Sequence, residues 1–150
     1  MTTRAGIIWS ADPRTGPRPK APFDLILLLC VTWPRAPGLR PGGVTIRRVR
    51  VVSEPLSDYL RWEHACTTVN IEAGEDIRWL PRTKAADPML PGADCWVFDH
   101  RVVRRNFQRG DGTNPRHYTF SSDPRTIRDI VAAFELAWNR ATPHAEYKPD

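Results

Sequence analysis

The clearest alternation of apolar and polar positions lies near the end of the chain. Its apolar positions recur three or four residues apart: Ile127, Ile130, Val131, Phe134 and Trp138. This spacing predicts an amphipathic helix with one apolar side. Asp123 is its expected N-cap, Pro124 fits its first position, and Pro143 ends it.

A second stripe follows Ser53 and predicts another amphipathic helix. Its members are Leu56, Tyr59, Trp62, Cys66 and Val69. Ser53 is the expected N-cap, with Pro55 in the first turn, and Gly74 is the expected stop. Because an apolar stripe normally faces the core, we expect Trp62 to be buried. We expect the same of three further tryptophans, namely Trp79, Trp96 and Trp138.

The nine residues from position 44 (VTIRRVRVV) predict a strand, because they are rich in β-branched side chains. Alternation places Val49 and Val51 on one face and Arg48 and Arg50 on the other. Ile46 falls on the arginine face, as does the first valine. Burying them with the other valines would therefore require a bulge or a twist.

Four later segments also predict strands: residues 75–80, 95–98, 101–107 and 116–120. Asp99-His100 predicts a turn between the second and third of them, and residues 110–112 (GDG) predict the next turn. The resulting order is β-α-β-β-β-β-α. We expect an α+β (or α/β) fold in which two amphipathic helices pack on a small mixed sheet.

Residues 1–43 differ from the rest because they contain seven prolines, which exclude long helices and central strands. A short element is expected only within residues 24–32. Two interpretations remain open: a disordered proline- and arginine-rich arm, or a non-native segment from a misread start. The domain prediction is therefore an arm at 1–43 and a single α/β domain at 44–150.

Charge and cysteine content narrow the class of protein. The net charge is +5, but residues 1–43 carry +4 of it and residues 44–150 only +1, so direct nucleic-acid contact is not expected. The longest apolar run, residues 25–31, is too short to cross a bilayer. With only Cys30, Cys66 and Cys95, a secreted disulfide scaffold is not expected either. We expect a cytoplasmic protein.

The sequence contains no recognisable catalytic or metal-binding motif. The cysteines and histidines lack the paired spacing of a zinc site, so no metal or other cofactor is expected. No serine is flanked by glycines as in a nucleophile elbow. His100 or His117 could lie near Ser121 or Ser122 by chance alone.

One segment offers a candidate ligand surface, where the first long strand ends and the first helix begins. Ligands collect at such ends in open α/β sheets. Its members are Arg50, Ser53, Glu54, Ser57 and Arg61. The alternative is a capped helix with a solvated ion-pair cluster, because acidic residues already occupy that helix start.

Three stretches carry a family resemblance: residues 47–64 (RRVRVVSEPLSDYLRWEH), 73–82 (AGEDIRWLPR) and 133–147 (AFELAWNRATPHAEY). They resemble the uncharacterised actinobacterial family known as domain of unknown function 6879. The resemblance implies a helical N-terminal half, which this chain lacks, and proximity to helix-turn-helix regulators. It supplies no catalytic residues.

A more distant similarity is to one half of the phospholipase D superfamily. Aligning Asp99 with the aspartate of its motif places Gly92 at the histidine and Asp94 at the lysine. Glycine cannot act as the nucleophile, and Asp94 would repel the phosphate. The similarity therefore implies a degenerate site.

Three functions follow from these observations. The first is a non-enzymatic accessory, sensor or interaction domain that accompanies a transcriptional regulator, with a regulatory protein as partner and an unknown small ligand. The second is a phosphodiesterase-like hydrolase with an unrecognised site. The third is a DNA-associated regulatory protein.

Overall fold

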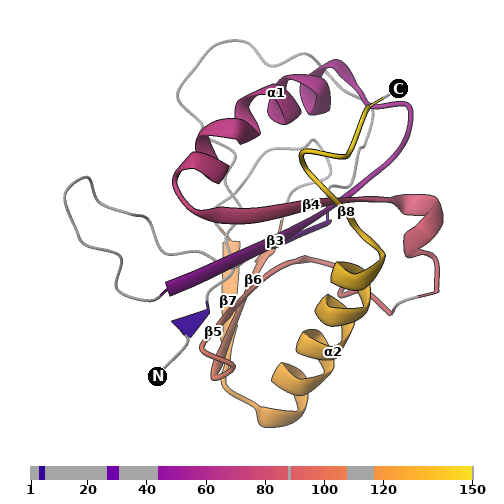
Figure 1. Ribbon diagram of the computed structural model, residues 1–150. Helices are drawn as coiled ribbons and strands as arrows, with labels where there is room; N and C mark the ends of the chain where they lie inside the picture. The colour runs from indigo at the N-terminus through magenta and orange to yellow at the C-terminus, as the bar shows by residue number, and fades with distance from the viewer. Residues whose placement is uncertain (1–3, 6–26, 31–43, 88, 108–116, 150) are drawn as a thin grey trace.

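The computed structural model describes residues 4–5, 27–30, 44–87, 89–107 and 117–149. Within them, two helices lie on opposite sides of a mixed β-sheet (Figure 1). The strands are β1 (Arg4–Ala5), β2 (Leu27–Cys30), β3 (Val44–Val52), β4 (Glu75–Pro81), β5 (Asp94–Phe98), β6 (Val102–Phe107), β7 (His117–Ser121) and β8 (Thr142–Pro143). The helices are α1 (Asp58–Glu72), the short 3-10 helix η1 (Arg82–Ala85) and α2 (Pro124–Arg140). The predicted α+β class is confirmed.

The strands are ordered β7-β6-β5-β2-β3-β4-β8, and β1 pairs with β3. β3 runs parallel to β4, and β2 runs parallel to β5. β5, β6 and β7 form an antiparallel meander. From position 44 onward the strand and helix order is the predicted one, with η1 and β8 added. The short element expected within residues 24–32 is β2, but it lies between β5 and β3 in the middle of the sheet. The expectation that the prolines of residues 1–43 exclude a central strand is therefore wrong, because they flank this segment and none interrupts it. The turn expected at 110–112 lies outside the described residues.

The expectation that Ile46 could be buried only with a bulge or a twist in β3 is wrong. The register with β4 is continuous from Ile46 to Val52, and Ile46 is nonetheless buried. It is buried because both faces of β3 are covered, one by each helix. Val49 and Val51 face α2, and Arg48 and Arg50 face α1, as the alternation predicts.

α2 is the helix that the sequence predicts. Asp123 caps it by accepting hydrogen bonds from the backbone N–H groups of Arg125 and Thr126, and Pro124 opens it. Its apolar side packs on the sheet through Ile127, Ile130, Phe134, Ala137 and Trp138, all buried. These side chains form one part of the core, and Leu60 of α1 with Trp79 of β4 belongs to the part on the other face.

α1 differs from the prediction at its start. Its N-cap is Ser57, whose hydroxyl accepts from the backbone N–H of Leu60 at 3.4 Å, and not Ser53. Pro55 explains the later start, because proline disfavours a helical conformation at the residue before it. The stop near Gly74 is confirmed by its positive φ of 99° and by its N–H, which donates to the Ile71 carbonyl.

The orientation of α1 also differs from the prediction. Trp62 is 62% exposed and Val69 is 69% exposed, and Cys66 is exposed too. The expectation that Trp62 lies in the core is therefore wrong, while the other three tryptophans are buried as predicted. The physical reason is the arginine face of β3. It needs acceptors, and α1 supplies Glu63.

Among the described residues, no helix combines the length and the apolar composition that crossing a bilayer requires.

Candidate functional site

The predicted ligand surface begins with Arg50 and Ser53, which the structure places in separate contacts. Arg50 is only 5% exposed, and its guanidinium is paired with the Glu63 carboxylate beneath α1. The same guanidinium lies 5.2 Å from the ring centroid of Trp79. The Ser53 hydroxyl accepts a hydrogen bond from Arg82 Nε at 3.3 Å.

The other three members of that surface also contact different parts of the fold. The Glu54 carboxylate accepts from the Tyr147 hydroxyl at 2.7 Å, which joins this segment to the end of the chain. Ser57 caps α1, and Arg61 Nε donates to the Leu56 carbonyl at 3.2 Å. Each of these contacts holds parts of the fold together. The binding of one ligand across all five residues remains a prediction.

Two histidines form a cluster with aromatic side chains on the α1 side of the sheet. The ring centroids of His64 and His144 are 4.4 Å apart. Trp79 Nε1 donates a hydrogen bond to His144 Nδ1 at 3.0 Å, and the Trp79 ring stacks on Tyr147 at 5.4 Å. This histidine cluster fastens the segment after α2 to β4.

The pKa values of both histidines are lowered, which favours the neutral form. Burial lowers the pKa of His64, a hydrogen bond with the backbone of Tyr147 raises it in part, and the Arg50 charge lowers it further. Burial also lowers the pKa of His144, and the charges of His64 and Arg50 act in the same direction. Because His144 Nδ1 already accepts from Trp79, the cluster is arranged for packing rather than for proton transfer.

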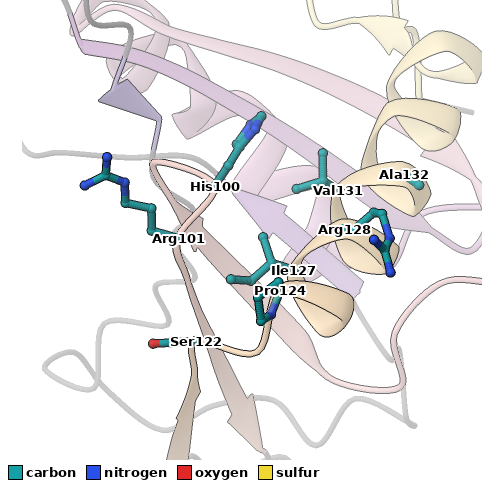
Figure 2. Close-up of a pocket in the computed structure, with 8 residues that line it drawn as sticks. All are labelled: His100, Arg101, Ser122, Pro124, Ile127, Arg128, Val131 and Ala132. Atoms are coloured by element: carbon teal, nitrogen blue, oxygen red, sulfur yellow. The ribbon is translucent and has the colours of Figure 1, made fainter.

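A third region is hollow. A pocket of about 620 Å³ lies between the β5–β6 turn and the first two turns of α2 (Figure 2). The turn is formed by Asp99 and His100, whose positive φ values of 50° and 54° confirm the predicted reversal. We call this cavity the turn pocket. Its volume is within the range of small-molecule sites, roughly 300–1,000 Å³.

The floor of the turn pocket is apolar and is provided by α2. Its members are Pro124, Ile127, Val131 and Ala132. Ile127 and Val131 belong to the stripe that packs on the sheet farther along the helix. The floor is thus the beginning of the stripe that also packs in the core.

The rim of the turn pocket is polar and rich in nitrogen donors. His100 and Arg101 come from the turn, Ser122 from the segment before α2, and Arg128 from α2. Figure 2 shows Arg101 and Arg128 on opposite sides of the apolar floor. The hydrogen bonds and ion pairs among the described residues do not involve either guanidinium. Arg128 acts on the Asp123 carboxylate through its charge without a hydrogen bond or ion pair, so the N–H donors of both guanidiniums can still meet an anionic group.

The start of α2 is already occupied by a carboxylate. Asp123 accepts from the Thr126 backbone N–H at 2.9 Å and from the Thr126 hydroxyl at 2.6 Å. These hydrogen bonds, first of all the one from the hydroxyl, lower the pKa of Asp123. An anion in the turn pocket would consequently meet the arginines and not the helix terminus.

His100 and Ser122 line the same pocket, so a candidate base and a candidate nucleophile are both present. Figure 2 shows their side chains pointing in different directions, with the imidazole directed away from the hydroxyl. Catalysis by serine needs a base in hydrogen-bond contact with it and a third group that orients the base. The turn pocket has the donors of a binding site, without such a contact.

The structure also bears on metals and cysteines. Among the described residues, no group of three or more histidine, cysteine, aspartate or glutamate side chains is placed to hold a metal ion. Cys95 is buried in β5 as predicted, and burial raises the pKa of its thiol to about 12. Cys66 is exposed on α1.

Sequence reasoning named His100 and the α2 stripe but not the pocket that they share. β6, β7 and the residues between them separate the turn from α2 along the chain, so no local pattern joins the two. One signal was present. Ile127 and Val131 begin the apolar stripe next to a serine, a proline and two arginines.

Comparison with known protein families matches residues 35–149 to the family described as Domain of unknown function (DUF6879). No curated protein and no solved structure matches the chain.

Proposed function

The chain belongs to the DUF6879 family, and we propose that it is a cytoplasmic, non-enzymatic accessory domain. In this proposal it is a sensor or interaction module of the kind that accompanies transcriptional regulators. The observation that carries the proposal is the turn pocket, in which an apolar floor lies between two arginines that make no hydrogen bond or ion pair among the described residues. A domain that binds a ligand without catalysing a reaction passes its signal on through a protein that it contacts. The proposal therefore includes a regulatory protein as partner.

The chemistry of the turn pocket indicates the class of its ligand. Guanidinium groups bind carboxylates and phosphates through charge-assisted hydrogen bonds. Ile127 and Val131 offer an apolar body an environment that excludes water. We therefore assign the pocket to an organic anion with an apolar portion, with its acidic group at Arg101 or Arg128.

The experiment is a titration with hexyl phosphate, followed by the methyl NMR signals of Ile127 and Val131. We expect saturable shifts of both signals. Hexanol lacks the charge and inorganic phosphate lacks the apolar chain, so each should bind more weakly. The absence of saturable shifts with hexyl phosphate would refute the assignment.

A pair of variants on α2 makes the test specific. Arg128→Gln removes a guanidinium of the rim and should weaken hexyl phosphate binding about tenfold. Arg125→Gln removes an equally exposed guanidinium of the same helix outside the pocket lining, and should leave binding unchanged. Equal losses in the two variants would indicate general charge attraction and not a site.

A phosphodiesterase-like hydrolase is the second candidate, favoured by the presence of His100 and Ser122 in one pocket. The test is release of p-nitrophenol from bis(p-nitrophenyl) phosphate. We expect the rate to equal that of buffer alone. A rate that is abolished by both His100→Gln and Ser122→Ala would establish the hydrolase and refute the non-enzymatic proposal.

A further inference from the structure

The residues that follow α2 lead from one face of the sheet to the other, and we call residues 142–149 the β8 segment. Figure 1 shows this segment passing the edge of the sheet from α2 toward α1. Its strand, Thr142–Pro143, pairs with β4 over two residues, and the His144 N–H donates to the Ile77 carbonyl at 3.0 Å. A ladder of this length contributes little stability by itself. The side chains around it therefore hold the segment in place.

The side chains that hold the β8 segment are those of the histidine cluster. Trp79 Nε1 on β4 donates to His144 Nδ1, and the rings of Trp79 and Tyr147 stack at an angle of 6°. The Tyr147 hydroxyl donates to the Glu54 carboxylate at 2.7 Å. His64 on α1 contacts both residues of the segment, with its ring centroid 4.4 Å from that of His144 and 5.9 Å from that of Tyr147. The cluster thus joins the β8 segment to β4, to α1 and to the segment before α1.

The hydrogen bonds of both imidazoles fit the neutral form and not the protonated one. His144 Nδ1 accepts from Trp79, so a proton on that nitrogen would place two N–H donors against each other. His64 Nε2 is buried and has no hydrogen-bond partner among the described residues, so its hydrogen bond with the Tyr147 backbone is made by Nδ1. A proton on Nε2 would create a buried N–H without an acceptor, which is costly. Protonation of either ring therefore disfavours the packed cluster.

The cations around the cluster oppose a further positive charge. Arg50 comes from β3, and its charge lowers the pKa of both histidines, after the larger effect of burial. The charge of His64 also lowers the pKa of His144, so one protonated ring opposes the other. Within the β8 segment, Glu146 and Lys148 are exposed to water, which screens their charges.

The carboxylates that face the cluster are already occupied. Glu63 comes from α1, pairs with Arg50 and accepts from the Tyr59 hydroxyl at 3.3 Å. Glu54 comes from the segment before α1 and accepts from Tyr147. A histidine charged in place would consequently meet a cation and no free acceptor.

We propose that proton uptake at His144 Nδ1 or His64 Nε2 releases the β8 segment from β4 and α1, while the sheet and both helices stay folded. In the closed form the Trp79 ring is fully buried, and Tyr147 covers one of its faces. Release moves Tyr147 away and exposes that ring. A fall in pH is thereby converted into an apolar surface on β4.

The release should occur in mild acid. Both pKa values are lowered in the closed form, chiefly by burial, and return toward the ordinary value of 6.5 once the imidazoles are in water. The released form therefore binds more protons below that value, and its share increases as the pH falls. α2 should stay folded in this range, because the pKa of its cap Asp123 lies below the ordinary value of 3.8.

The first experiment is amide hydrogen exchange of the full chain at pH 7 and pH 5, expressed as protection relative to an unfolded peptide at the same pH. The amides of His144, Glu146 and Tyr147 all donate hydrogen bonds in the closed form. Their protection should fall at least about tenfold between the two pH values, and that of α2 should change less than about twofold. Unchanged protection of the β8 segment refutes the proposal. An equal loss in α2 also refutes it, because the whole fold would then open.

The second experiment removes the two titrating rings together. His64→Asn with His144→Asn keeps side-chain amides that can form the hydrogen bonds to Tyr147 and Trp79. Protection of the β8 segment at pH 5 should then stay within about threefold of its value at pH 7. His117→Asn replaces an exposed histidine of β7 and should leave the full loss in place. Equal losses in the two variants would refute the role of the cluster.

The third experiment needs no variant of the cluster. The Cε1–H signals of His64 and His144 are followed by NMR over the same pH range, and their titration should accompany the loss of protection. A loss that occurs while both rings remain neutral would refute the proposal. None of these measurements requires a ligand, so their outcome is independent of the assignment of the turn pocket.

Discussion

α1 and α2 cover opposite faces of one sheet with opposite kinds of contact. α2 buries apolar side chains on the side of Val49 and Val51. α1 meets the side of Arg48 and Arg50 with a carboxylate, while its apolar stripe faces outward. The difference shows that buried arginines on a sheet face require a carboxylate from the helix above them, although Leu60 of that helix is buried there too. The alternation along β3 decides which helix meets which surface.

Arginines are present on the α2 side too, but they are held differently. Arg47 forms a two-bond pair with Glu135, both at 2.8 Å, and its guanidinium lies 4.4 Å from the ring centroid of Trp138. Arg78 lies 4.1 Å from the same ring. Glu135 is 43% exposed, so this pair remains partly in water. The cations of the α2 side border the core, whereas those of the α1 side are enclosed.

The largest expected effect compares the same residue type on the two helices. Trp138→Ala removes a buried ring that also contacts Arg47 and Arg78, and should lower the free energy of unfolding by about 3–5 kcal/mol. Trp62→Ala should change it by less than about 0.5 kcal/mol, because that ring is exposed. Urea denaturation at low micromolar protein measures both. Similar losses would show that the Trp62 ring is covered within a single chain.

These two tryptophans also mark the limit of prediction from the sequence. The α2 stripe and its cap were both predictable, because the local pattern and the tertiary packing agree there. On α1 the local pattern favoured burial of Trp62, and the tertiary need of Arg50 for Glu63 prevailed. The arginines of β3 are visible in the sequence. Their pairing with Glu63, however, depends on which helix covers which face of the sheet. The turn pocket was less predictable still, since it joins segments that only the meander brings together.

The next largest effect compares an ion pair from each face. Glu63→Ala leaves Arg50 buried without its partner and should cost about 3 kcal/mol of unfolding free energy. Glu135→Ala breaks the half-exposed pair with Arg47 and should cost about 1 kcal/mol or less. Chemical denaturation of both variants gives the comparison. Arg50→Met combined with Glu63→Leu should recover most of the loss, since an apolar pair replaces the buried charges. Failure of that recovery would mean that the arginine is needed for more than pairing.

The smallest expected effect is a pH dependence that belongs to the α1 side alone. The pKa values of His64 and His144 are lowered in the folded protein, chiefly by burial and also by the neighbouring Arg50. The unfolded chain therefore binds more protons than the folded one between the lowered values and the ordinary value of 6.5. Stability should be constant above that range and should fall as the pH drops through it.

The two carboxyls with lowered pKa, Asp123 and Glu135, titrate in a separate and more acidic range, below the ordinary values of 3.8 and 4.5. Urea midpoints measured between neutral pH and about pH 5 therefore isolate the histidines. Replacing His144 with Asn should flatten the slope, because Trp79 then donates to an amide that does not titrate. Replacing the exposed His117 with Asn is the matched control and should leave the slope unchanged. A slope that persists in the His144 variant would place the acid-sensitive element outside the cluster, and the contrast between the two helices would then rest on Arg48 and Arg50 alone.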